Sequence, residues 1–166
     1  MLLSGAVVLL GAALAFACAG KPIPKAPVVE VPVDAGEPDV APPPPPLYTR
    51  IGAADGVSAI VDSFIDNLLA DKRLKKAFAH TTKGPKLDHF KEMLRDQVCE
   101  LAGGGCHYTG KTMSDAHGSM KITSAQFDAF IEDFKLALEE KQVSKDDEQQ
   151  LLDLMNVLKD QIVTQK

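Results

Sequence analysis

Proline placement limits the part of this chain that can fold to residues 47–166. Ten of the eleven prolines lie between Pro22 and Pro46, and the last five of these are consecutive. Proline fixes φ and has no backbone N–H to donate, so this stretch is expected to be an extended, polyproline-like spacer. The chain beyond the spacer is long enough for one domain and too short for two of ordinary size.

The segment before the spacer has the pattern of an export signal. Residues 1–20 carry no charged side chain, and their apolar stretch 6–17 has the length of a signal-peptide core, which is short for a membrane span. Small residues at Ala15 and Ala17 precede Cys18, and this arrangement resembles the cleavage and acylation site of bacterial lipoproteins.

We therefore expect a signal peptide over 1–17, a disordered Pro-rich linker over 18–46 that is lipid-anchored at Cys18, and a folded domain over 47–166. Such a protein lies in the periplasm or at the cell surface, held at the membrane, by analogy the outer one. Ordinary secretion with an unmodified Cys18 is the alternative. The proline run also has an alternative role, since such runs dock into aromatic grooves of partner proteins.

The charge balance argues against nucleic acid as a partner. The chain has 18 basic and 23 acidic side chains, for a formal net charge of −5. Nucleic-acid binding needs a basic footprint. The one basic block, Lys72-Arg73-x-Lys75-Lys76, is interpreted as an exposed helical turn within 72–78.

Apolar residues recur at helical spacing in four long stretches, and no segment alternates with the period of a strand. The stretches are 53–70, 85–101, 123–138 and 144–162. Pro85 suits a first helical turn, and Gly103-Gly104-Gly105 suits a helix end. Thr123 with Gln126 predicts a capping box, and Ser144 is expected to cap the last helix. The domain is therefore predicted to be all-α.

The connection 103–122 is unusually long for a helical domain and rich in side chains that bind ligands. It holds Cys106, His107, Tyr108, Met113, His117 and Met120. Helices of a plain bundle are joined by a few polar residues, whereas a long irregular connection commonly carries function. This segment is where we expect the functional site.

Short motifs in a fixed order resemble the group 1 truncated haemoglobins. They are Leu47-Tyr48-x-x-Ile51-Gly52, Val61-Asp62-x-Phe64, Leu69-Ala70-Asp71, Ala77-Phe78, Gly103-Gly104, Tyr108-Thr109-Gly110, Met113, His117-Gly118, Ile122-Thr123 and Phe127-Asp128. The resemblance covers 47–166 and implies a two-over-two helical sandwich that encloses haem. It also implies a diatomic gas as the ligand.

The resemblance implies that His117 is the proximal ligand of the haem iron, which suits the chemistry of neutral imidazole. The other side chains expected around the cofactor are Phe64, Ile65, Phe78, Phe90, Met93, Leu94, Tyr108, Met113, Ile122 and Phe127. Covalent attachment through a C-x-x-C-H motif would need cysteine at Gly103. The expected cofactor is therefore noncovalent haem b.

The distal side departs from the family pattern. Ile65 stands where many members have a tyrosine, and Leu94 stands where they have a glutamine. With Phe90, these residues offer no hydrogen-bond donor to bound oxygen, which favours NO or CO over slowly released oxygen. Met93 occupies the place of an internal sixth ligand in some relatives, but packing or solvent exposure is the expected role. His89 is a further candidate for that ligand if the helix register differs by one turn.

The two cysteines of the domain are expected to pair. With Cys18 assigned to lipid, Cys99 and Cys106 remain, and the glycines between them allow the chain to turn back. An oxidising compartment favours this bond.

These patterns are compatible with three functions. The first is a tethered haem protein that reversibly binds a diatomic gas, with a role in NO or oxygen chemistry, in sensing, or in electron exchange with a periplasmic partner. The second is a haem enzyme of the peroxidase or NO dioxygenase type, although the distal residues include no evident acid–base group. The third is a haem-free helical lipoprotein, which would have no need of the residues around His117 in that order.

Overall fold

Helices make up most of the part of the chain that the structure, a computed structural model, describes, which is residues 42–81 and 83–165. The helices are α1 (Leu47–Arg50), α2 (Ala53–Ala70), α3 (Pro85–Leu101), α4 (Met113–His117), α5 (Ser124–Glu140), α6 (Lys145–Asn156) and α7 (Lys159–Ile162). No strand occurs in these residues, and their single isolated β-bridge joins Thr123 to Gln165. The predicted all-α class is confirmed. The expectations for residues 1–41, including Cys18, lie outside the described residues.

Local sequence signals set the helix ends. Pro85 occupies the first turn of α3. Beyond the end of α3, Gly103 and Gly105 take positive φ angles of 77° and 73°, which side chains disfavour. The Thr123 hydroxyl accepts from the Gln126 backbone N–H at 3.2 Å while the Gln126 side chain accepts from the Thr123 N–H at 3.1 Å, which is the predicted capping box.

Two predicted elements differ in the structure. The connection 103–122 contains a short helix, α4, which begins because Thr112 caps it by accepting from the Asp115 N–H at 3.1 Å. The last predicted helix is broken into α6 and α7. At the break, the Leu158 N–H bonds to the Met155 carbonyl at 3.1 Å, a tighter turn than the helical one. Leu158 and Ile162, which belong to the apolar stretch 144–162, consequently line a cavity between the helices.

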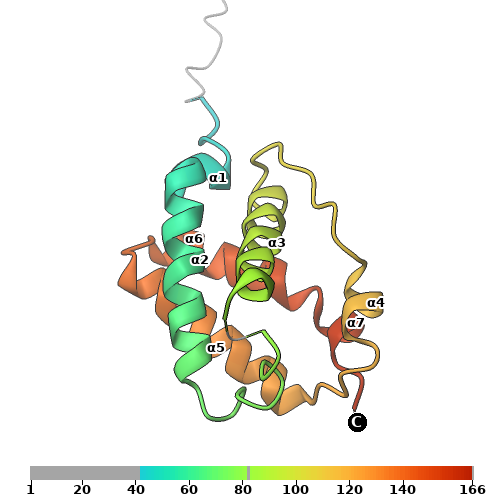
Figure 1. Cartoon of the computed structure of the whole chain (residues 1–166). Coiled ribbons are helices and arrows are strands. Elements are labelled where there is room, and N and C mark those ends of the chain that lie inside the picture. The colour runs from blue at the N-terminus through green and yellow to red at the C-terminus, as the bar shows by residue number, and fades with distance from the viewer. Residues whose placement is uncertain (1–41, 82, 166) are drawn as a thin grey trace, which may run out of the picture. The chain divides into compact units, whose positions relative to one another are not determined.

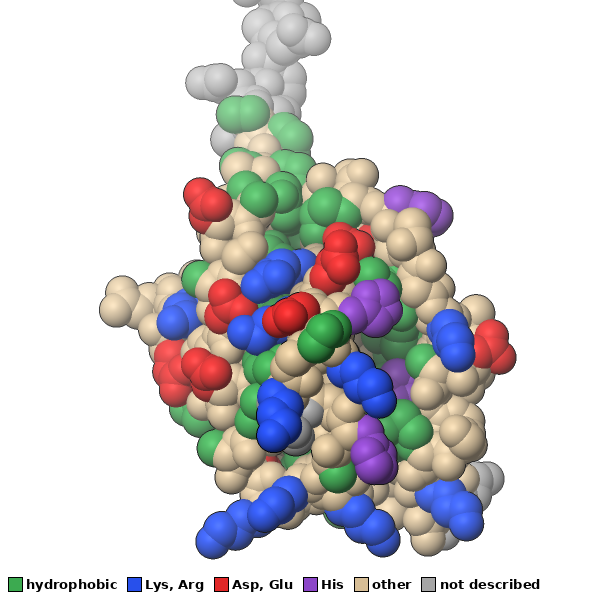
Figure 2. Space-filling model, in the orientation of Figure 1, with side chains coloured by type: hydrophobic (Ala, Val, Ile, Leu, Met, Phe, Trp, Pro, Cys, Tyr) green, Lys and Arg blue, Asp and Glu red, His purple; other side chains and the backbone are tan. Residues whose placement is uncertain are grey.

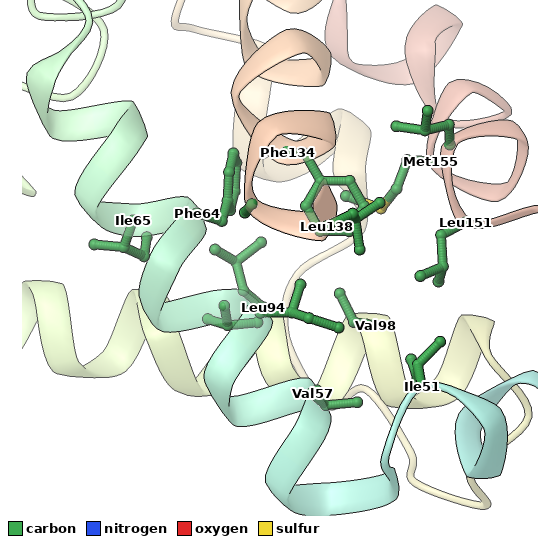
Figure 3. Packing of buried hydrophobic residues seen from close by; sticks show 14 of the residues in the cluster. Ile51, Val57, Phe64, Ile65, Leu94, Val98, Phe134, Leu138, Leu151 and Met155 are labelled. Atoms are coloured by element: carbon green, nitrogen blue, oxygen red, sulfur yellow. The ribbon is translucent and has the colours of Figure 1, made fainter. Parts of the chain in front are cut away.

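The hydrophobic core lies where α2 crosses α5 and packs against α3 (Figure 1). Phe64 of α2 meets Phe130 and Phe134 of α5 edge-on, with ring centroids 4.8 and 5.3 Å apart. Leu138, Leu151 and Met155 extend this core toward α6 (Figure 3). Edge-to-face aromatic pairs stabilise such a core beyond the area they bury.

The start of the domain is tied to elements far along the chain. The Tyr48 N–H bonds to the Ala102 carbonyl at 2.9 Å, at the end of α3. The Arg50 guanidinium bonds to Asp147 and to Gln150 of α6, at 2.7 Å each. These contacts hold α1 against the end of α3 and against α6. In the part of the chain that the structure describes, we find no helix long and apolar enough to cross a lipid bilayer.

Candidate haem site

A largely apolar cavity of about 460 Å³ lies between α3 on one side and α4, α5 and α7 on the other. This volume is in the range of cofactor and ligand sites. Most of the side chains predicted to surround haem line it: Phe78, Phe90, Met93, Leu94, Tyr108, Met113, His117, Ile122 and Phe127. The structure therefore brings together residues from distant parts of the sequence around one space.

The cavity opens on the face shown in Figure 2, where a hollow with hydrophobic side chains lies among histidine and lysine side chains. Lys86, His89 and Lys111 contribute to its lining and are exposed. An apolar interior with a cationic rim suits a flat apolar ligand with anionic groups at one edge.

His117 lies on the α4 side of the cavity, and a hydrogen bond to the backbone sets which of its ring nitrogens carries the hydrogen. Its Nδ1 is 2.8 Å from the Met113 carbonyl oxygen. A carbonyl oxygen only accepts, so Nδ1 carries the hydrogen and the Nε2 lone pair of the neutral ring remains free. This orienting bond on the second ring nitrogen is the arrangement that prepares a histidine for a metal. The donor set therefore fits haem iron.

Short-range contacts hold α4 in place. The Thr112 hydroxyl both accepts from the Asp115 N–H and donates to the Asp115 carboxylate, at 3.1 and 2.8 Å. On its other flank, α4 packs against α7. These contacts set where His117 stands, because the helix has only five residues and little stability of its own.

The Tyr-Thr-Gly motif before α4 has a structural explanation. The Tyr108 hydroxyl donates to the Lys111 carbonyl at 3.0 Å, which closes the loop over Gly110. A Cβ at Gly110 would overlap the Tyr108 ring, so glycine is required there. Burial raises the pKa of Tyr108, and its ring forms part of the cavity wall.

The facing wall is one side of α3. Phe90, Met93 and Leu94 all line the cavity, and the Phe90 ring lies 5.5 Å from that of Phe78, centroid to centroid. Met93 is half-buried. His89 also lines the cavity, but its side chain is 69% exposed and faces Glu92 of its own helix.

Two predicted cofactor contacts do not line the cavity. Phe64 forms a layer behind the wall, because Phe130 stands between it and the cavity and contacts its ring. Ile65 is 1% exposed and packs on the other side of α2 from Phe64 (Figure 3). The rotation of α2 about its axis, which the core packing sets, places both side chains in the protein interior. The cofactor contacts expected for Phe64 and Ile65 stay predictions.

Sequence reasoning missed several lining residues. Leu74, Phe130, Met155, Leu158 and Ile162 complete the apolar wall, and Gln97 adds a buried amide to it. The position of Gln97 was readable in the sequence, because it lies three residues after Leu94 and shares its helix face.

A disulfide joins Cys99, at the end of α3, to Cys106, with the two Cα atoms 5.7 Å apart. It spans the glycine turn that leads from one wall of the cavity toward the other. Cys99 is 3% exposed, so the bond is anchored in the packed end of α3.

A helical sandwich around an apolar cavity, with a histidine in the wall whose second ring nitrogen is bonded to the backbone, is the architecture of a globin. The model of the bacterial-like globin family matches residues 46–164. The group 1 truncated hemoglobin of Tetrahymena pyriformis is 35% identical over 97 residues, which are 58% of this chain and 77% of that protein. GlbN of Synechocystis, another group 1 truncated hemoglobin, is 31% identical over 104 residues, 60% of this chain and 81% of that protein.

Solved structures agree with this relationship. The Fe(III) form of the Tetrahymena pyriformis truncated hemoglobin matches with a TM-score of 0.67 and 28% identity, over 72% of this chain and 98% of that one. The 2/2 hemoglobin of Synechococcus, in the cyanomet state and with covalently attached heme, matches with a TM-score of 0.65 and 25% identity, over 73% and 100% of the two chains. This chain belongs to the bacterial-like globins, and within them to the group 1 truncated haemoglobins.

Proposed function

We propose that this protein holds haem b noncovalently in the cavity through His117 and reversibly binds O₂, NO or CO outside the cytoplasm. The observation that carries the proposal is the bond between His117 Nδ1 and the Met113 carbonyl, which leaves Nε2 free to face the cavity. When bound, haem would supply an iron atom that can take a diatomic gas as a ligand.

The residues of the chain provide the conditions for reversible binding. His117 holds the cofactor on the α4 side and is fixed by its backbone bond. Phe90 and Leu94 of α3, with Phe127 of α5, line the ligand space with apolar surface, which disfavours water there. Water exclusion favours release of the ligand as a neutral molecule.

Noncovalent attachment is supported by the composition of the lining. The lining residues, all in the described part of the chain, include no cysteine, and both cysteines of the domain are in the disulfide. Acidified butanone should therefore extract all the haem into the organic phase. Colour that stays with the protein would contradict noncovalent binding.

The compartment is a separate part of the proposal. The uncharged stretch 1–20 with Cys18 supports export and lipid anchoring, and the Cys99–Cys106 disulfide is the kind of bond that persists in oxidising compartments. A periplasmic electron donor would then keep the iron reduced. Mass spectrometry of the membrane fraction tests this, with an acylated N-terminal Cys18 expected and an intact Met1 contradicting it.

The decisive experiment is the visible spectrum of the purified protein with and without reductant. We expect a Soret band, and we expect it to disappear in His117→Ala. His107→Ala is the matched control, because the His107 side chain is 85% exposed and lies outside the cavity lining. An unchanged Soret band in His117→Ala would exclude His117 as the ligand.

The same spectra address Met93. We expect the ferrous, unliganded protein to be five-coordinate and high-spin, with Met93 acting as wall packing. Six-coordinate, low-spin bands that vanish in Met93→Leu would instead assign Met93 as an internal ligand. Stopped-flow mixing with NO and with peroxide separates ligand binding from the enzymatic alternatives.

A further inference from the structure

Gln97 is the polar residue that the cavity buries most. Among the described residues, the buried polar side chains are Ser63, Gln97, Asp133, Asp147 and Glu148, and of these Gln97 alone lines the cavity. It is 9% exposed. Lys86, His89 and Lys111, by contrast, stand at the exposed rim.

Other polar groups of the interior have partners within the protein. The Tyr108 hydroxyl donates to the Lys111 carbonyl, and His117 Nδ1 donates to the Met113 carbonyl. The side-chain oxygen of Gln126 accepts from the Thr123 backbone N–H. For Gln97, we find no hydrogen bond to the side-chain amide within residues 42–81 and 83–165. The fully buried side-chain atoms without a partner in this part of the chain belong to Asn67, Arg95 and Asp133. The Gln97 amide is not among them; it lies on the cavity lining, where it can bond to a polar group that enters the cavity.

The register of α3 places the amide beside the ligand space. Gln97 follows Phe90 by seven residues, Met93 by four and Leu94 by three, so all four share the face that lines the cavity. A helical side chain leans toward the N-terminus of its helix and covers the preceding turn. The Gln97 amide therefore extends over the turn that carries Met93 and Leu94.

We propose that the Gln97 Nε2–H group donates a hydrogen bond to a diatomic ligand held in this cavity, and so favours O₂ over CO. This inference rests on the proposed function. It supplies the donor that the apolar residues Phe90 and Leu94 lack. Oxygen accumulates negative charge when it binds ferrous haem and gains from a donor, whereas CO remains nearly nonpolar and gains little.

The test is the infrared C–O stretching band of the ferrous protein saturated with CO. A donor beside the ligand draws electron density into the C–O antibonding orbitals and lowers this frequency. Gln97→Met keeps the length of the side chain without the amide, and Gln97→Glu keeps its shape but replaces the donor by an acceptor. We expect the band to move to higher frequency in both variants.

Oxygen kinetics provide a second readout. Loss of one neutral hydrogen bond to the ligand should raise the oxygen dissociation rate about tenfold. The CO dissociation rate should change much less. Gln149→Met serves as the control, because Gln149 lies on the exposed side of α6 and bonds to Asp153 there.

The outcomes separate this inference from the proposed function. Absence of a Soret band in the wild-type protein would overturn both. A normal Soret band with an unshifted C–O band in either folded variant would overturn the role of Gln97 alone, and would mean that its amide bonds to water or to the edge of the cofactor. Circular dichroism establishes whether each variant is folded. Because Gln97→Met and Gln97→Glu differ in polarity, one of them still tests the proposal if the other fails to fold.

Discussion

Asp133 is a buried carboxylate outside the cavity, and it makes the stability of the domain depend on pH. It is 8% exposed on α5, and its Oδ2 has no hydrogen-bond partner among the described residues. Burial, followed by the nearby charge of Asp71, raises the pKa of Asp133 to about 6 against the opposing effect of Arg73. The folded state therefore binds this proton more tightly than the unfolded state does.

Protonation of Asp133 stabilises the folded domain at acidic pH. The stabilisation is complete below the ordinary pKa of 3.8 and is lost as the pH rises through about 6. Asp133→Asn cannot ionise, so it should remove this loss and stabilise the domain near neutral pH by about 1–2 kcal/mol. Urea denaturation at pH 5 and pH 7.5 measures it. Asp66→Asn, an exposed change of the same charge, should leave the pH dependence as in the wild type.

Single residues differ in how far the sequence alone defines them. The place of His117 in the cavity wall was predictable because the ordered motifs around it identify its position in the family. The lining position of Gln97 was also readable from its spacing, but its burial was not, since burial depends on the helices that pack against α3. The burial of Ile65 behind the cavity lining was not readable either, because a family position says which helix a side chain comes from, whereas core packing decides which way it points.

At the scale of the helices, α5 depends on its N-terminal cap, and this end of α5 carries the cavity residues Gln126 and Phe127. Thr123→Ala removes the hydroxyl that accepts from the Gln126 N–H, so it should lower the free energy of unfolding by about 1 kcal/mol. Chemical denaturation measures the loss. Ser124→Ala is the matched control, because Ser124 is exposed at the first helical position, and an equal loss there would rule out the capping explanation.

The disulfide stabilises the turn that leaves α3. Cys99 and Cys106 are seven residues apart, and closing so short a loop in the unfolded chain is worth about 2 kcal/mol. A reductant should therefore lower the melting temperature of the wild-type protein and have no effect on Cys106→Ser. Thiol titration before reduction should detect neither Cys99 nor Cys106, and two reactive thiols from these positions would contradict the bond.

Helix starts were predictable and helix breaks were not. The starts of α3, α5 and α6 rest on local chemistry: Pro85, the Thr123–Gln126 pair and Ser144, whose hydroxyl accepts from the Asp147 N–H at 3.2 Å. The break between α6 and α7 coincides with no proline or glycine in the sequence. It lets α7 pack against α4 and bring Ile162 to the cavity, which is a tertiary contact.

For the whole molecule, the cofactor should act as a structural part of the domain. The cavity walls come from α3, α4, α5 and α7, and without haem their side chains lose contact partners across the space. A ligand at one hundred times its dissociation constant stabilises the folded state by about 2.7 kcal/mol. We expect added haemin to raise the melting temperature of the haem-free protein, followed by circular dichroism, and to do so much less in His117→Ala.

The two-over-two architecture was predictable from the ordered motifs, because they span nearly the whole domain. The presence of a cavity could be predicted from the family resemblance but not from the hydrophobic pattern. Its apolar lining residues repeat at the same helical spacing as core residues, so the pattern does not distinguish the two. Leu158 illustrates this, because it belongs to the apolar stretch 144–162 at helical spacing and yet lies in the cavity wall.

The position of α7 has a consequence for how the protein matures. Leu158 and Ile162 complete the cavity, and the backbone of Thr164 and Gln165 bonds to Ile122, next to the start of α5. These residues leave the ribosome after every other wall of the cavity. The complete cavity therefore exists only after residues 158–165 have been synthesised, and in a chain exported in an unfolded state it would form only after transport.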